Sequence, residues 1–156
     1  MLYMNIKMPK LRACLAVPFA AFLLLAVPPP AALAREAAAP IEHARGSDAI
    51  LADAYARHIS GLQVSGQGRV IKVLKDDREG RRHQRFLLRL GSGQVVLVAH
   101  NIDLAPRVEG LRTGDTVEFF GEYEWNAKGG VIHWTHRDPR GRHTDGWLKH
   151  DGLVYR

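Results

Sequence analysis

Cysteine is nearly absent from this 156-residue sequence. Its one cysteine, Cys14, lies in an apolar segment that we expect to be removed, so the mature chain would have none. A chain without cysteine has no disulfide, no thiol nucleophile and no thiolate ligand for a metal. Any catalytic or metal site would therefore depend on the eight histidines and on the carboxylates.

Apolar runs of membrane-spanning length are also absent. The longest run, Ala13 to Val27, falls short of the ~20 residues that a helical span needs. Basic residues precede it and Ala32-Leu33-Ala34 follows, which is the layout of a secretory signal peptide with its cleavage site. We expect a signal peptide over residues 1–34, cleaved after Ala34, and a flexible lead-in over 35–46. An uncleaved membrane anchor is the alternative, which Pro18 disfavours because it interrupts the span.

Excess positive charge largely disappears with the signal. Three of the 22 basic residues and none of the 16 acidic ones precede residue 35, so the net charge falls from +6 to +3. A balance this close to zero is weak support for nucleic-acid binding. We expect a periplasmic or secreted protein without integral membrane association after cleavage.

The pattern of residues 47–156 predicts one mainly β domain. Helical spacing of apolar residues between Ser47, a candidate N-cap, and Gly61 predicts an N-terminal α-helix. Alternating runs separated by turn residues then predict a small sandwich or barrel. The expected strands are Val64–Lys75, His83–Leu90, Gln94–His100, Thr116–Trp125 and Gly130–His136.

Between the third and fourth expected strands, Asn101–Asp115 has room for a short helix but not for a full crossover. Five antiparallel strands with a helical insert at this place are the plan of an OB-fold. We therefore predict a small five-stranded OB-like antiparallel barrel with an N-terminal helix and a short helical insert.

Four segments have a distinctive composition. They are DDREGRRHQRFLLRLGSGQ, AHNIDLAPR, GDTVEFFGEYEWN and GGVIHWTHRDPRGRHTDGWLKHDG. Over Gly66 to Tyr155 the chain resembles a family of short exported bacterial proteins known as domain of unknown function 3465. The resemblance implies an OB-like barrel, and it implies no activity.

Histidines gather near the C-terminus, at His133, His136, His143 and His150. With Asp138 they are of the type that binds zinc or copper. If His133 and His136 share a strand, however, they point to opposite faces. The favoured interpretation is that these side chains hydrogen-bond a C-terminal loop to the barrel, and contact with a ligand without metal is a third. His133-Trp134-Thr135 is also an H-x-T triplet, but a phosphoesterase would need a second one.

A basic run surrounds the first expected hairpin, and tryptophans occur elsewhere. OB domains that bind single-stranded nucleic acid combine such charges with aromatic rings. Asp76, Asp77 and Glu79 interrupt the run, so a solvated charged face is the simpler interpretation.

Polar residues follow the apolar third strand at His100, Asn101 and Asp103. They would face a pocket, or they would form a turn in which Asn101 and Asp103 cap the insert. The turn is the simpler of the two.

We expect a non-enzymatic binding module for a small ligand or peptide, with no catalytic residue, metal or cofactor. Any site should lie at one barrel mouth, where polar side chains orient the ligand and tryptophans stack on it. Its expected residues are His100, Asn101, Asp103, Trp125, His133, Trp134 and His136. The alternative is a metal-dependent hydrolase or nuclease that uses the C-terminal histidines and Asp138. Single-stranded nucleic-acid binding is a further alternative.

Overall fold

The computed structural model describes residues 46–156, so the expected signal peptide and all but the last residue of the expected lead-in lie outside the described residues. Residues 46–56 are helical, and seven strands follow. The strands are β1 (Leu62–Val73), β2 (His83–Leu90), β3 (Val95–Asn101), β4 (Thr116–Glu124), β5 (Val131–His133), β6 (Trp147–His150) and β7 (Leu153–Tyr155). In the described part of the chain, no helix is long and apolar enough to cross a membrane.

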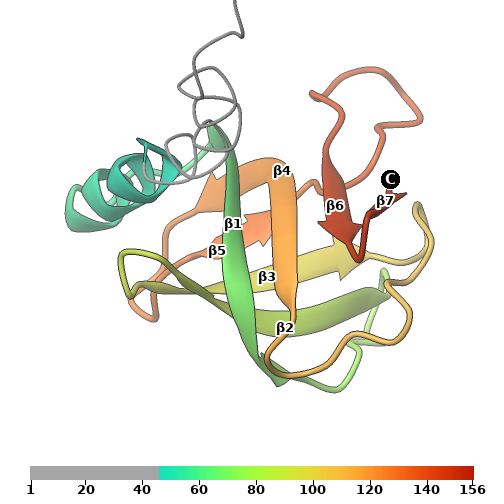
Figure 1. The fold of residues 1–156 in the computed structure, drawn as a ribbon. Helices are drawn as coiled ribbons and strands as arrows, with labels where there is room; N and C mark the ends of the chain where they lie inside the picture. Colours follow the sequence, from blue (N-terminus) through green and yellow to red (C-terminus); the bar gives the residue numbers. More distant parts are fainter. Residues whose placement is uncertain (1–45) are drawn as a thin grey trace, which may run out of the picture.

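Strands β1 to β5 close into a barrel (Figure 1). Around the ring the order is β1, β2, β3, β5 and β4, and β4 pairs again with β1. Four of these pairings are antiparallel and the β3–β5 pairing is parallel. The expectation of an entirely antiparallel barrel was therefore wrong. Five strands cannot alternate in direction all the way around a closed ring, so one neighbouring pair must run the same way.

The last two strands, β6 and β7, were not expected from the sequence. β5 ends at His133, three residues before the expected end, and the chain leaves the barrel at Trp134, whose φ is 52°. The chain returns at Trp147, where β6 begins. β6 pairs with the first half of β4, with Phe120 opposite Trp147, whereas β5 pairs with the second half. β6 therefore continues the line of β5 after a long loop, residues 134–146, and β7 pairs with the outer edge of β6.

The core fills the barrel as the alternation predicts. On β4, Val117, Phe119 and Tyr123 are fully buried, and on β2 so are Phe86 and Leu88. The helix packs Leu51 and Ala54 against this core. It ends before Gly61, because His58 takes the left-handed conformation and the N–H of Ile59 bonds to the carbonyl of Ala54.

The segment between β3 and β4 is a correction to the prediction, because residues 102–115 form turns and loop rather than a short helix. Asn101 Oδ1 accepts a hydrogen bond from the N–H of Asp103, an Asx turn that competes with helix formation. Pro106 has no N–H to donate, and Gly110 has a φ of 69° that ends any regular run. The loop still closes one end of the barrel, with Val108 fully buried.

Candidate functional site

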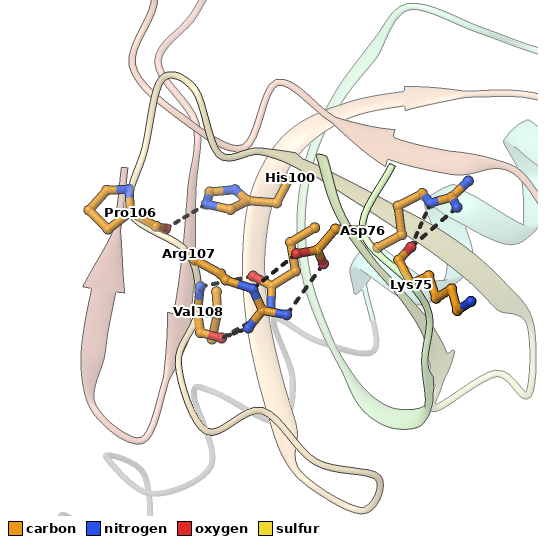
Figure 2. A network of polar contacts seen from close by, with 8 residues as sticks. Lys75, Asp76, His100, Pro106, Arg107 and Val108 are labelled. Atoms are coloured by element: carbon orange, nitrogen blue, oxygen red, sulfur yellow. Dashed lines mark hydrogen bonds and ion pairs between the residues drawn. The ribbon is translucent and has the colours of Figure 1, made fainter. Parts of the chain in front are cut away.

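His100 is fully buried on the inner face of β3. Its Nε2 lies 3.1 Å from the carbonyl oxygen of Pro106, as Figure 2 shows, and its Nδ1 lies 2.8 Å from Thr135 Oγ1. Because a carbonyl only accepts, Nε2 carries the proton and the Thr135 hydroxyl donates to Nδ1. Burial lowers the pKa of His100 to about 4, so the ring is neutral at neutral pH.

The barrel-closing loop is fastened at three consecutive residues. His100 holds Pro106, and Arg107 Nε and Nη2 each lie 3.3 Å from the carboxylate of Asp76 (Figure 2). Buried Gln84 on β2 makes two hydrogen bonds with Val108, donating to its carbonyl at 2.9 Å and accepting from its N–H at 2.8 Å. His100 therefore anchors the loop from inside the barrel.

Asn101 and Asp103 form the turn that follows β3. The carboxylate of Asp103 accepts hydrogen bonds from the backbone N–H of Arg82 at 2.8 Å and from its Nε at 2.6 Å. These two bonds lower the pKa of Asp103. The pair joins the turn to the start of β2. The predicted turn is present, but Asn101 and Asp103 do not cap a helical insert, because residues 102–115 form none.

A cavity of about 310 Å³ opens beside this turn. Three of the seven expected site residues line it: Asn101, Asp103 and Trp134. The other lining residues are Arg81, Leu104, Asp138, Pro139, Arg140 and Arg142, from the approach to β2, the turn after β3 and the loop after β5.

The arginines of the cavity were missed by the sequence reasoning. Within the part of the chain that the structure describes, the side chains of Arg81, Arg140 and Arg142 make no hydrogen bond and no ion pair. The two acids of the cavity are already engaged, Asp103 by Arg82 and Asp138 by backbone N–H groups. The cavity is therefore lined by three exposed arginines without a hydrogen bond or ion pair, of which Arg142 lies near enough to Asp138 for its charge to help lower the pKa of that carboxyl.

Asp138 organises the loop that carries two of these arginines. Its carboxylate accepts from the backbone N–H groups of Arg140 at 3.0 Å, Arg142 at 2.7 Å and His143 at 2.9 Å. These bonds lower the pKa of Asp138, which stays ionised at neutral pH. Asp138 thus fixes the loop, as the hydrogen-bonding interpretation of the C-terminal cluster predicts.

Trp134 lies half-buried between the cavity and His143. The two rings stack with centroids 4.1 Å apart and planes 7° apart. Both nitrogens of His143 face acceptors, the carbonyl of Thr144 at 2.8 Å and Glu122 Oε2 at 2.6 Å. Burial alone would lower the pKa of His143, but these acceptors outweigh it and the net shift is upward. The indole therefore stacks on a ring that favours its charged form.

The C-terminal histidines do not share one site. His136 bonds to the carbonyl of Arg137 at 2.7 Å, and His150 bonds to Asp115 at 2.9 Å. His133 instead faces two glutamates of β4, Glu122 and Glu124, across the β4–β5 pairing. The metal cluster that the alternative interpretation would build from the C-terminal histidines and Asp138 is therefore not assembled among the described residues. From the sequence alone, Glu122 and Glu124 could be assigned only to the polar face of the fourth expected strand.

Trp125 lies apart from the other expected site residues. Trp125 directly follows the end of β4, which pairs with the start of β5. Trp134 directly follows the end of β5, so the two tryptophans lie at opposite ends of that strand. The ring of Trp125 lies 4.1 Å from that of His58, and its Nε1 donates to the carbonyl of Tyr55 at 3.1 Å. Trp125 thus packs under the helix, and the structure does not bring it to the cavity.

The expected basic hairpin is interleaved with ion pairs. Arg85 lies 3.7 Å from Asp77, and Arg82 and Arg107 hold Asp103 and Asp76. These contacts fit the mixed-charge surface predicted as the simpler interpretation.

The family model described as Protein of unknown function (DUF3465) matches residues 36–156. The chain belongs to this family. The resemblance seen in four segments is thereby confirmed, and the match extends to the N-terminal side of Gly66. The comparison with curated proteins found no match. Since the description of DUF3465 names no activity, the function has to be argued from the cavity and its charges.

Proposed function

We propose that this DUF3465 member is an exported, non-enzymatic binding protein of the cell envelope that holds a small anionic ligand. The ligand occupies the cavity beside the β3 turn. The observation that carries this proposal is a cavity lined by Trp134 and by three arginines whose side chains make no hydrogen bond or ion pair in the described part of the chain, while its two acids are held by other groups.

The proposed scaffold is an OB-like barrel. A closed five-stranded barrel whose ring order is not the chain order fits the Greek-key connections of that fold. The loop over residues 102–115 takes the position where we expected a helix, and it closes the end of the barrel that the helix would have closed. Ligands of barrel proteins commonly bind at such a mouth.

The side chains select the ligand by charge and shape. Guanidinium groups present paired donors that match carboxylate and phosphate oxygens. A volume of about 310 Å³ suits a small molecule, and Trp134 offers apolar ring surface next to the charges. The preferred ligand therefore combines one phosphate or carboxylate with a planar or apolar part.

Isothermal titration of the tag-free full chain with phenyl phosphate tests this proposal. We expect binding of phenyl phosphate and roughly tenfold weaker binding of inorganic phosphate or phenol, since each lacks half of the recognised group. Arg140→Gln and Arg142→Gln should each weaken binding by roughly 10- to 150-fold, because a hydrogen bond to a charged group contributes roughly 1.5–3 kcal/mol.

Arg78→Gln is the matched control, because Arg78 is exposed in the charged hairpin and does not line the cavity. Phenyl phosphate affinity should be unchanged in this variant. If the double variant of Arg140 and Arg142 bound phenyl phosphate as well as Arg78→Gln does, the cavity would not be the site.

Export is tested by N-terminal sequencing of the protein from the periplasm or the medium of the producing cell. We expect the first residue at or near Arg35. A chain that keeps residues 1–34 in the membrane fraction would contradict export and support the anchor alternative.

A further inference from the structure

We propose that Glu122, Glu124 and His133 form a binding site for one divalent transition-metal ion. The site uses the outer face of β4 and β5, shares no residue with the anion cavity, and goes beyond the proposed function.

The strand register brings the three side chains together. Glu122 and Glu124 are two residues apart on β4, so they point to the same face of the sheet. His133 lies directly opposite Glu122 in the antiparallel β4–β5 pairing. One ligand atom from each residue lies within 4.8 Å of the other two. The three side chains are thus placed by regular backbone and not by a loop.

The distances between His133 and the two glutamates are longer than a strong hydrogen bond and closer to those between ligands of one metal ion. His133 Nε2 lies 3.4 Å from Glu122 Oε1 and 3.9 Å from Glu124 Oε1, and neither contact is a hydrogen bond. Two ligand atoms bound to one Zn²⁺ at 2.0–2.2 Å and a tetrahedral angle lie roughly 3.3–3.6 Å apart. The distance from Nε2 to Glu122 Oε1 falls within this range, whereas the distance to Glu124 Oε1 is wider than it.

The Nε2 atom of His133 is not engaged by any other group of the described residues. It is shielded from solvent and has no hydrogen-bond partner among the described residues. When Nδ1 carries the proton, the lone pair of Nε2 faces two carboxylate oxygens, and a cation bound between them would stabilise this arrangement.

His143 supports the site from behind. Its Nε2 donates to Glu122 Oε2 at 2.6 Å, which leaves Oε1 of the same carboxylate facing His133. A hydrogen bond that orients a ligating carboxylate is a regular feature of metal sites.

The donor set indicates which ions fit. One imidazole nitrogen and two carboxylate oxygens suit Zn²⁺ or Mn²⁺ better than a thiophilic ion. Three protein ligands also leave one position for water.

Isothermal titration of the tag-free full chain with ZnCl₂ is the test. We expect one equivalent of Zn²⁺ to bind, with affinity at least tenfold lower in His133→Gln and in Glu124→Gln. His143→Gln, which removes the supporting bond and also the ring stacked on Trp134, should weaken Zn²⁺ binding by about tenfold. Zn²⁺ at one hundred times its Kd should raise Tm by roughly 5–10 °C.

Matched controls are His83→Gln and Glu118→Gln. His83 lies at the start of β2, and Glu118 shares the outer face of β4 but pairs with Lys149. Both variants should keep the full Zn²⁺ affinity, as should Arg140→Gln, and far-UV circular dichroism should show that every variant folds. Absence of stoichiometric binding, or equal affinity in His133→Gln and His83→Gln, would overturn the proposal. Neither result would affect phenyl phosphate binding in the cavity.

Discussion

Lowering the pH from 7.5 to 4 is expected to remove about 3 kcal/mol of unfolding free energy through His100 alone. The folded pKa of this buried ring is about 4, against an ordinary value of 6.5. Above pH 6.5 the ring is neutral in both states and its contribution is complete. As the pH falls from 6.5 toward 4, the unfolded chain binds a proton that the folded chain does not, so stability is lost.

Other titrating groups also change the free energy of unfolding between pH 7.5 and 4, in both directions. His133, whose pKa burial also lowers, adds to the loss. His143 acts in the opposite sense, because its raised pKa gives stability that is present at low pH and lost as the pH rises. Asp103 and Asp138 have lowered pKa values and therefore lose their contributions mainly below pH 4.

Urea unfolding of wild type and His100→Gln at both pH values isolates the His100 contribution. The variant should be less stable at pH 7.5, and its deficit should shrink by about 3 kcal/mol at pH 4 because glutamine does not titrate. Gln67→Leu on β1, which changes no titrating group, should keep a constant difference from wild type. A deficit of His100→Gln that is the same at both pH values would contradict the assignment.

Gln84→Leu should lower the unfolding free energy by roughly 2–5 kcal/mol. Gln84 is fully buried, and its amide satisfies both backbone groups of Val108, itself fully buried. Leucine has a similar size but leaves the N–H of Val108 without a partner and its carbonyl with only the 3.4 Å bond from Arg107 Nη1. The barrel-closing loop would then lose its central attachment.

Chemical unfolding at pH 7.5 measures this effect, with Gln67→Leu on β1 as the control. Gln67 is only partly buried and does not contact Val108, so its replacement should change stability by less than about 1 kcal/mol. Equal losses in the two variants would mean that Gln84 is not an anchor.

Much of the barrel could be predicted from the sequence, because period-two alternation is strong where one face is buried. The first four strands begin and end within two residues of their expected bounds. The short strands β6 and β7 could not be predicted, since β6 depends on the free edge of β4 that β5 leaves after His133. The expected helix after β3 failed because the Asn101 side chain took the backbone N–H of Asp103.

The candidate site could be predicted only in part. Asn101, Asp103 and Trp134 were found because they follow apolar strands, and that is where barrel mouths form. Arg140 and Arg142 could not be predicted as cavity residues, because their positions depend on a loop that is held by three backbone N–H groups bonding to Asp138. The pairing of Glu122 with His133 depends on strand register, which composition does not reveal.

A titration followed by ¹H–¹⁵N NMR tests the central claim, an anion-binding cavity beside Trp134, most directly. The chain has three tryptophans, Trp125, Trp134 and Trp147, and each indole N–H gives its own signal. Phenyl phosphate should move the Trp134 signal alone, and the double variant of Arg140 and Arg142 should abolish that shift. A Trp134 signal that stays fixed while Trp125 or Trp147 moves would place the ligand elsewhere and contradict the account.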